Sequence, residues 1–268
     1  MRAAGLRVAC VGLAGQCDPA LKAECDAYAE AGLVRIGKWA RLLRRWGARH
    51  AVMVGGVRKA RMYEPMRLIR QVPDWRAVKL WYQVLRHDRR DQTLLEAVAN
   101  ELERGGIELM DTTHYVTDHL ASAGVMTQRQ PSDRQWADIR FAWPILMRLN
   151  ELDVGQSLAV KERDVIAVEA IEGTDAMIDR AGGLCKTGDW VLVKGTDARK
   201  DRRFDVPAVG EQTIARLQAS GCHCLAVAAN QVILLEKPKL LEAADKAGIA
   251  VVGVSQTNDH ADSASREG

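Results

Sequence analysis

The chain has 268 residues, of which 47% are hydrophobic and 27% charged, and its formal net charge is +3. This length and apolar content can build one large domain or two ordinary ones, which excludes disorder of the whole chain. No apolar run approaches the roughly 20 residues that cross a bilayer, and the opening residues do not form a convincing signal peptide. We therefore expect a soluble, cytoplasmic protein.

Positive charge is concentrated in the first half of the chain. Residues 35–90 contain 16 Lys and Arg but only three acidic residues, a local balance of +13 that leaves −10 for the remainder. Such a segment indicates an anionic partner, namely a phosphorylated ligand, a membrane surface or nucleic acid. A solvated helical face explains the same charges equally well.

The six cysteines show neither CxxC spacing nor the density of a secreted disulfide scaffold, so we expect reduced thiols. Cys222 and Cys224 flank His223, and in a strand both sulfurs would point to one face. Because no second ligand cluster could complete a zinc site, we interpret both as plain buried cysteines.

The first half alternates short apolar runs with helical patterns. Residues 6–13 and 51–56 read as buried parallel strands, and apolar residues recur at helical spacing between them, from Trp39 to Trp46. Helices are predicted at 75–85 and at 92–103, the second capped by Asp91, followed by a strand at 107–110. A long helix at 131–149 should be capped by Ser132 and kinked or divided at Pro144.

The second half has a different pattern. Residues 157–161 and 164–171 suggest a hairpin, a helix should begin at Thr174, and residues 190–195 form a strand. A helix at 210–220, strands at 224–229 and 231–236, a helix at 237–247 and a strand at 249–254 complete the fold. This mixture predicts the α/β class with two domains, residues 1–150 and 151–256, and a disordered tail at 257–268.

Several common nucleotide and hydrolase motifs are absent. No GxGxxG follows a strand, and neither GxxxxGK[ST] nor GxSxG occurs. The sequence therefore lacks the fingerprint motifs of dinucleotide-binding proteins, P-loop proteins and hydrolases with a nucleophile elbow. The His-rich and Asp-rich pattern of a binuclear metallophosphoesterase is missing as well.

Unusual polar chemistry gathers instead in three loops, at residues 153–156, 169–177 and 194–207. Each loop also has a structural explanation: Thr174 or Asp175 could cap a helix, Gly173 could allow a turn, and Asp205 could stabilise the turn before Pro207.

Taken together, the loops resemble one family. The strings DVGQ, VEAIEGTDAM, VLVKG, RRFDVPAVG and AADKAGIAVVGV occur in the order and spacing typical of the second domain of LpxI-type UDP-2,3-diacylglucosamine pyrophosphatases. In the first half, DPAL, IGKWARLL, VGGVRK and DQTLL resemble that family's first domain. The resemblance covers about nine tenths of the chain.

The resemblance implies hydrolysis of UDP-2,3-diacylglucosamine to UMP and lipid X during lipid A biosynthesis, with Mg²⁺ or another divalent cation such as Mn²⁺. It also implies a Rossmann-like N-terminal domain and a second, catalytic α/β domain. Relatives begin with an additional strand and a Gly-rich loop, so either the true start lies upstream of the first Met or the first domain lacks its first strand. The family's essential catalytic Asp corresponds to Asp205.

The chemistry of a diphosphate agrees with these residue types. Cations must neutralise the charge of its oxygens, and a carboxylate must hold a metal or orient water. Asp205, with Glu172 and Asp175 as helpers, supplies carboxylates for a metal. Lys194 and Arg203 are candidate cations for the phosphoryl oxygens.

Further substrate-binding candidates are polar groups or glycines beside turns. Gly173 and Thr174 stand at a helix start, where free N–H groups favour a phosphate. Gln156 suits a substrate amide or hydroxyl. Gly55 and Gly56 would let the backbone approach the ligand closely, and Asp91 is either a ligand or a helix cap.

The lipid substrate adds two expectations. Acyl chains need an apolar wall, and candidates within the basic segment are Met62, Trp75, Leu80, Trp81 and Leu85, although core packing is the commoner role. Basic residues around such a wall predict transient contact with an anionic membrane surface, peripheral at the inner membrane.

Three alternatives remain open at this point: hydrolysis of another UDP-sugar on the same scaffold, a non-catalytic lipid-binding relative, and a nucleic-acid-binding protein. With two Phe and four Tyr, the chain offers few rings for base stacking beyond Trp, so nucleic acid is not the expected partner. A homo-oligomer is left open.

Overall fold

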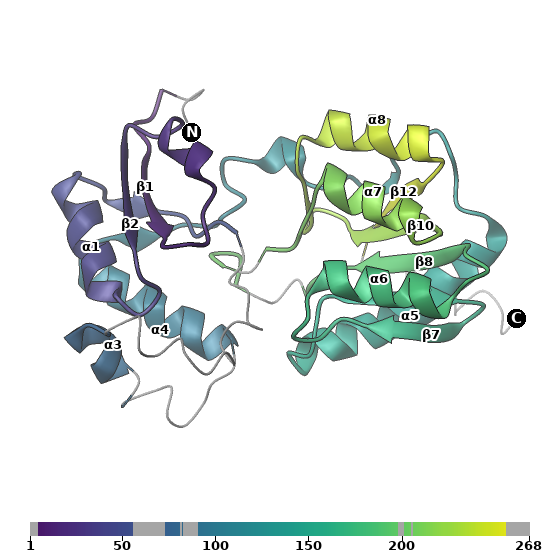
Figure 1. The fold of residues 1–268 in the computed structure, drawn as a ribbon, viewed down its shortest axis with the longest axis horizontal. Helices are drawn as coiled ribbons and strands as arrows, with labels where there is room; N and C mark the ends of the chain where they lie inside the picture. The colour runs from purple at the N-terminus through teal and green to yellow at the C-terminus, as the bar shows by residue number, and fades with distance from the viewer. Residues whose placement is uncertain are drawn as a thin grey trace, which may run out of the picture. The chain divides into compact units, whose positions relative to one another are not determined.

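The computed structural model describes residues 5–55, 73–80, 82, 91–197, 201–204 and 206–255. The chain forms two compact units, which Figure 1 shows with the element labels used below. One unit comprises Met1–Tyr115 with Asp201–Asp205, and the other comprises Val116–Lys200 with Val206–Gly268. The expected disordered tail, 257–268, lies outside the described residues.

The boundary between the units differs from the predicted one near residue 150. It falls after Tyr115, because helix α5 (Asp133–Glu151) packs against strands β6 (Ser157–Lys161) and β8 (Trp190–Lys194) and belongs to the second unit. Its apolar residues Ile139, Trp143 and Leu146 are buried in that unit's core. Assigning α5 to the first domain was therefore wrong.

The described residues of the first unit form two pairs of parallel strands and several helices. Strand β1 (Ala9–Leu13) pairs with β2 (Ala27–Ala31), and β3 (His50–Ala51) pairs with β4 (Glu108–Leu109). The helices are α1 (Ile36–Arg45), α3 (Trp75–Leu80) and α4 (Asp91–Arg104), with a 3-10 turn at Pro19–Lys22. Sequence predicted β1, α1, α3, α4 and β4 but missed β2, whose sequence AYAEA contains no β-branched residue.

The second unit is built on a six-stranded mixed sheet of order β5-β12-β10-β8-β6-β7. Strands β8, β10 (Cys222–Ala228) and β12 (Ala250–Val254) are parallel. Strand β6 runs antiparallel to β8 and forms a hairpin with β7 (Asp164–Val168), and β5 (Gly124–Val125) is antiparallel to β12. Together with the helices of both units, this sheet confirms the predicted α/β class.

Helices cover this sheet. Helices α6 (Thr174–Leu184), α7 (Glu211–Ala219) and α8 (Lys237–Ala247) lie side by side (Figure 1). Every residue of β8 is buried, which requires cover on both faces and explains its unbroken apolar sequence WVLV. The predicted strand at 231–236 is reduced to β11 (Ile233–Leu234), which pairs outside this sheet with β9 (Ala208–Val209).

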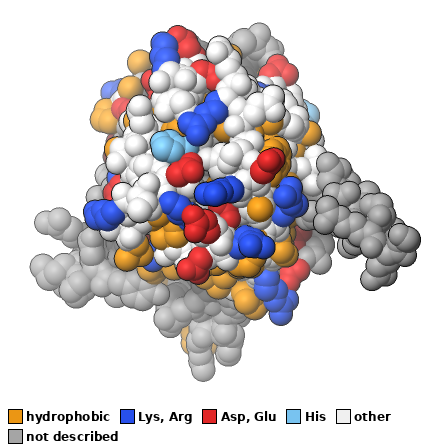
Figure 2. All heavy atoms as spheres, turned by 90° about the vertical axis from the view of Figure 1, so that its right-hand side faces the viewer, with side chains coloured by type: hydrophobic (Ala, Val, Ile, Leu, Met, Phe, Trp, Pro, Cys, Tyr) orange, Lys and Arg blue, Asp and Glu red, His pale blue; other side chains and the backbone are white. Residues whose placement is uncertain are grey.

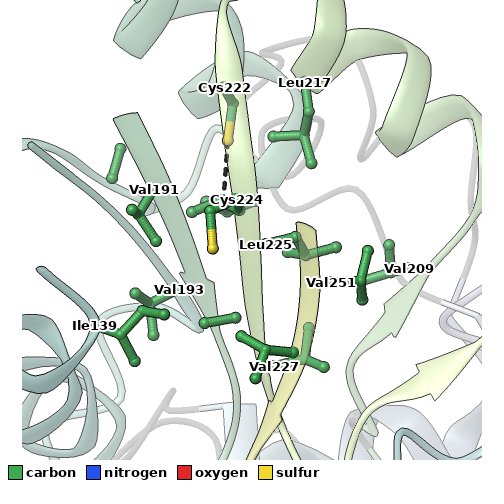
Figure 3. Close-up of a cluster of buried hydrophobic side chains, with 14 of the residues drawn as sticks. Ile139, Val191, Val193, Val209, Leu217, Cys222, Cys224, Leu225, Val227 and Val251 are labelled. Carbon is green, nitrogen blue, oxygen red and sulfur yellow. Dashed lines mark hydrogen bonds between the residues drawn. The ribbon is translucent and has the colours of Figure 1, made fainter. Parts of the chain in front are cut away.

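Branched side chains from the three parallel strands form the core of the second unit. Figure 3 shows Val191 and Val193 of β8 beside Leu225 and Val227 of β10, with Val251 of β12 next to them. All five are fully buried. Removal of such apolar area from water is the main favourable term in folding.

Outward-facing side chains of both charges are interspersed on the face of the molecule drawn in Figure 2. The second unit also contains ion pairs between exposed side chains, including Arg216 with Asp179 and Lys246 with Glu242. Exposed pairs of this kind contribute little stability, so they mainly keep the face solvated.

The start of α5 matches its prediction. Ser132 Oγ accepts from Gln135 N, and Gln135 Oε1 accepts from Ser132 N, which forms a complete capping box. The helix is not divided at Pro144, contrary to one of the expected outcomes.

A buried carboxylate of α5 holds the turn of the β6–β7 hairpin. Glu162 and Arg163 both adopt left-handed backbone conformations in this turn, with φ of 52° and 60°. Asp138, which is 3% exposed, accepts their N–H groups at 3.1 and 2.6 Å. The carboxylate thus satisfies two amides that the turn leaves without ladder partners.

Replacing Asp138 with Asn is expected to lower the free energy of unfolding by about 1–3 kcal/mol, because one of the two amides would face an N–H donor. Urea unfolding measures this loss. Arg140→Gln removes a charge from an exposed position of the same helix and serves as the control. Equal unfolding midpoints for the two variants would contradict the role assigned to Asp138.

Candidate functional site

A buried lysine lies at the carboxyl end of the central strand β8. Lys194 is 5% exposed, and its Nζ donates to Thr174 Oγ1 at 2.7 Å and to Ser157 Oγ at 3.2 Å. The carboxylate oxygen Oε2 of Glu169 lies 3.9 Å from the same Nζ. Three polar side chains thus surround the Lys194 ammonium: Ser157 of β6, Glu169 just after β7 and Thr174 of α6. We call these four residues the Lys194 cluster.

Sheet register explains why Ser157 and Lys194 meet. Strand β6 is antiparallel to β8, and these two residues are direct partners across the pair. Directly opposed residues have side chains on the same face at short separation. Glu169 follows β7 immediately, and its N–H donates to Ser157 O at 3.0 Å, which continues the hairpin by one residue.

Gly155 allows the segment before β6 to press against Glu169. A Cβ built on Gly155 would lie 2.0 Å from the carbonyl oxygen of Glu169, far inside contact distance. The segments with the sequences DVGQ and VEAIEGT are therefore in direct contact. Gly155 is required there because any side chain would clash with the backbone of Glu169.

The amino end of α6 lies beside the Lys194 cluster. Gly173 precedes the helix with φ 85° and no side-chain cap, and the first helical bond runs from Met177 N to Gly173 O at 3.2 Å. The N–H groups of Thr174, Asp175 and Ala176 come before that bond and so have no partner within the helix. A helix start of this kind favours an anion.

Glu172 and Asp175, the predicted metal helpers, both lie beside arginines. Glu172 Oε1 accepts from Arg180 at 2.5 Å, whereas Asp175 is 3.8 Å from the Arg216 guanidinium. Partial burial raises the pKa of Glu172, but its hydrogen bonds and Arg180 lower it more, so that its pKa lies below the ordinary value. Glu172 is thus held by Arg180, whereas Asp175 is exposed and Arg216 has Asp179 as its closer partner. No group of three metal-binding side chains occurs within the described ranges.

Arg203 belongs to the first unit, not to the second as predicted. Its guanidinium contacts Asp201 at 2.7 Å and Glu103 at 2.9 Å and lies over the Phe204 ring at 5.5 Å. These carboxylates raise the pKa of Arg203, Asp201 having the larger effect. The structure thus gives this side chain a role in attaching the segment around it.

The remaining predicted residues have varied outcomes. Gln156 accepts from Gly195 N at 3.0 Å through its backbone oxygen. Gly55 has φ 88° and open space where a Cβ would stand. Asp91 begins α4, but its side chain, like all of Gly56 and Asp205, lies outside what the structure describes. Their predicted roles stay predictions.

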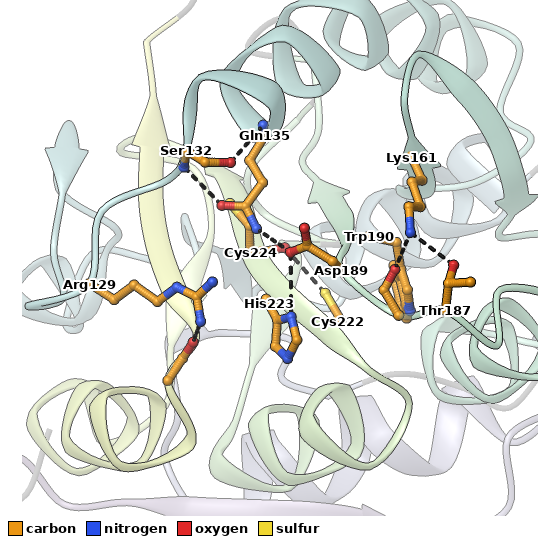
Figure 4. Close-up of polar contacts among 12 residues, drawn as sticks. Arg129, Ser132, Gln135, Lys161, Thr187, Asp189, Trp190, Cys222, His223 and Cys224 are labelled. Atoms are coloured by element: carbon orange, nitrogen blue, oxygen red, sulfur yellow. Dashed lines mark hydrogen bonds and ion pairs between the residues drawn. The ribbon is translucent and has the colours of Figure 1, made fainter.

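Cys222 and Cys224 are free and buried, as expected, and burial raises the pKa of the Cys222 thiol to about 12. The neighbouring His223 faces Asp189 at 3.4 Å, and Asp189 also accepts from Gln135 at 3.0 Å (Figure 4). This chain of contacts begins at the α5 cap and anchors the start of β8. It is a structural feature and carries no nucleophile.

The first unit has an open depression of about 460 Å³ that contains none of the predicted site residues. Its walls come from the ends of α4, β3 and β4. They are formed by Arg49, His50, Glu103, Gly106, Ile107 and Glu108. With no buried charged side chain among them, these walls give a weaker binding site than the Lys194 cluster.

Sequence reasoning assigned no role to Ser157 or Glu169. Ser157 stands at the start of a predicted strand, and Glu169 was included in a predicted strand that in fact ends at Val168. Their signal was a polar residue at each end of an otherwise apolar hairpin. The pairing of β6 with β8 places Ser157 opposite Lys194, and the contact across the end of the hairpin brings Glu169 to the same ammonium.

Comparison with known proteins identifies the family of the chain. The sequence models of the LpxI N-terminal domain and the LpxI C-terminal domain match residues 1–119 and 122–252. The chain belongs to the LpxI family. A relative from Caulobacter vibrioides, described as UDP-2,3-diacylglucosamine pyrophosphatase LpxI, is 29% identical over 262 residues, which are 94% of this chain and 90% of the relative.

The boundary between the two LpxI domain matches, at residues 119–122, lies close to the boundary between the structural units. The C-terminal match contains all four residues of the Lys194 cluster. In this LpxI-family protein, the cluster is therefore a property of the C-terminal domain.

Gly155→Ala is expected to lower both the stability of the protein and its affinity for UDP. The new methyl group must displace Glu169 from the Lys194 cluster. Overpacking of this kind costs about 1–3 kcal/mol. Urea unfolding and ligand titration measure the two effects. Gly183→Ala, in α6 with open space around its Cβ position, is the control and should be neutral or slightly stabilising. A Gly155→Ala protein that matches Gly183→Ala would contradict the packing argument.

Proposed function

We propose that this protein hydrolyses UDP-2,3-diacylglucosamine to UMP and 2,3-diacylglucosamine 1-phosphate, lipid X, in lipid A biosynthesis. Membership of the LpxI family and the activity named for the Caulobacter vibrioides relative support the substrate. The observation that carries the proposal is the Lys194 cluster at the amino end of α6.

The cluster is suited to a diphosphate in two ways. The N–H groups at the start of α6 offer donors in a fixed arrangement, and the helix dipole adds positive potential at the same place. The buried ammonium of Lys194 adds a further positive charge in surroundings where water screens it little. Donors held in place before the substrate arrives need no reorganisation when charge develops on the phosphoryl oxygens.

Asp205 is the proposed catalytic residue, acting with a divalent cation such as Mg²⁺ or Mn²⁺. Since Glu172 and Asp175 are paired with arginines, the described carboxylates do not form a prepared metal site. The proposal therefore assigns the cation to Asp205 and leaves the other two residues to position α6. A bound cation would neutralise charge on the diphosphate.

The activity is tested by following UMP release from UDP-2,3-diacylglucosamine in the presence of Mg²⁺. Asp205→Ala is expected to reduce the rate by at least about 100-fold while leaving the unfolding midpoint unchanged, and EDTA should abolish activity until Mg²⁺ is restored. Asp201→Ala, four residues earlier, controls for loss of a carboxylate in the same segment. Equal rates for the wild type and Asp205→Ala, or full activity in EDTA, would remove Asp205 or the metal from the mechanism.

Unacylated UDP-glucosamine in the same assay separates this function from that of a general UDP-sugar hydrolase. Turnover of both compounds at similar kcat/KM would favour the broader activity. Binding of the acylated substrate without any release of UMP would indicate a non-catalytic lipid-binding relative.

We also propose transient contact of the first unit with an anionic membrane. On α3, Ala77 and Leu80 are buried whereas Trp75 is 79% and Val78 40% exposed. Helices α1 and α3 together contain six Lys or Arg and no acidic residue. Exposed aromatic rings beside basic side chains suit the interface of an anionic bilayer. No helix within the described ranges has the length and apolar composition to cross a membrane.

Vesicle sedimentation tests the membrane proposal. Binding to phosphatidylglycerol vesicles should exceed binding to phosphatidylcholine vesicles, and Trp75→Ala should weaken it several-fold because the apolar anchor is lost. Leu184→Ala, at an exposed apolar position of the second unit, is the matched control. Binding that is indifferent to lipid charge, or equal in the two variants, would refute the assigned surface.

A further inference from the structure

Glu169 has an unusual environment for a carboxylate. Its side chain is 13% exposed, and its Oε1 accepts from Thr174 Oγ1 at 2.9 Å. The other oxygen, Oε2, is buried with no hydrogen-bond partner among the described residues and faces Lys194 Nζ at 3.9 Å. The carboxylate therefore balances the charge of Lys194 while directing a hydrogen bond to Thr174.

The chemistry of the three groups fixes the direction of every bond. A lysine ammonium can only donate and an ionised carboxylate can only accept. Thr174 Oγ1 accepts from Lys194, so its single proton must go to Glu169. Thr174 is the first residue of α6, and the cluster thereby determines how that helix begins.

The backbone of Glu169 is held as firmly as its side chain. Its N–H donates to Ser157 O, and its carbonyl lies against Gly155. Because both its backbone and its side chain are held, the Glu169 carboxylate can keep Lys194 and Thr174 in the precise positions that substrate binding requires.

Stability alone does not account for a carboxylate at this place. A buried ion pair is often no more stable than apolar side chains of similar volume. Asp138 is a buried carboxylate at the opposite end of the same hairpin, where it satisfies two backbone amides that would otherwise be unpaired. Among the described residues, no backbone N–H donates to the Glu169 carboxylate; its partners there are two side chains of the candidate site.

We infer that Glu169 is a positioning residue for diphosphate binding: through Lys194 and Thr174 it holds the amino end of α6 in the orientation that receives the substrate. The inference rests on the proposed pyrophosphatase function and adds to it a residue that does not itself touch the substrate.

Glu169→Gln keeps the size of the side chain and an oxygen that can accept from Thr174, but removes the charge that faces Lys194. KM for UDP-2,3-diacylglucosamine should rise about tenfold with a much smaller change in kcat, since ground-state positioning is affected. Asp138→Asn, which neutralises the α5 carboxylate that holds the turn of the hairpin, should lower stability at unchanged KM. If Glu169→Gln behaves like Asp138→Asn, the positioning role is refuted.

A double-mutant cycle tests the route through Thr174. Because Glu169→Gln retains the acceptor for Thr174, this cycle uses Glu169→Leu, which removes that contact as well. If Glu169 acts through the hydroxyl, Glu169→Leu should raise KM less in a Thr174→Val background than in the wild type. Additive effects of the two changes would show independent action and overturn the inference.

Titration calorimetry with UDP on the same set of variants separates this inference from the proposed function. UDP affinity that falls about tenfold in Glu169→Gln but not in Asp138→Asn supports the positioning role even if the wild type releases no UMP, an outcome that would sink the proposed function alone. Unchanged UDP affinity in Glu169→Gln would overturn the inference whether or not the wild type turns over its substrate.

Discussion

The buried ammonium of Lys194 is the constraint around which the second unit's functional end is arranged. A charge taken out of water is costly unless acceptors surround it, and this one stands at the end of a strand that is buried throughout. Ser157, Thr174 and Glu169 supply that surrounding, and each comes from a different segment. The start of α6 and the end of the hairpin are consequently tied to the central strand.

Glycines make this arrangement sterically attainable. Gly155 lets two backbone segments approach more closely than any side chain would allow, and Gly173 adopts a positive φ immediately before α6. The first places Glu169, and the second turns the chain so that Thr174 reaches Lys194. The polar cluster and the glycines around it thus form one unit of structure, in which loss of a small residue displaces charged groups.

The loop that follows β8 is shared between the two units. Lys194 lies in the second unit, whereas Asp201–Asp205 is assigned to the first, where Phe204 is buried and Thr112 N donates to Arg202 O at 3.0 Å. Arg203 is held there by Asp201 and Glu103. The described residues of this segment therefore belong to different units: Lys194 is part of the sheet of the second unit, and residues 201–204 are held by contacts within the first.

Sequence alone determined the elements with strong local signals. The apolar run of β8, the two short apolar runs of the β6–β7 hairpin, the Ser132 capping box and the amphipathic helices α4 and α8 are all encoded within a few neighbouring residues. The motifs sufficed to indicate the LpxI family. Local signals failed for β2, whose residues have low strand propensity and are held by pairing with β1. Local signals also failed to predict the domain boundary. The apolar face of α5 shows that the helix is buried, but not against which sheet it packs.

The candidate site divides in the same way. Lys194, Thr174 and Gly173 were predictable because polar residues and a glycine interrupt apolar patterns at strand and helix ends. Ser157 became visible only when antiparallel pairing placed it opposite Lys194, and Glu169 only when the end of the hairpin brought its carboxylate to the same ammonium. Arg203 changed its assignment once its carboxylate partners were known. Sequence specifies what each segment prefers by itself, whereas contacts between segments far apart in the chain decide which polar groups share a buried charge.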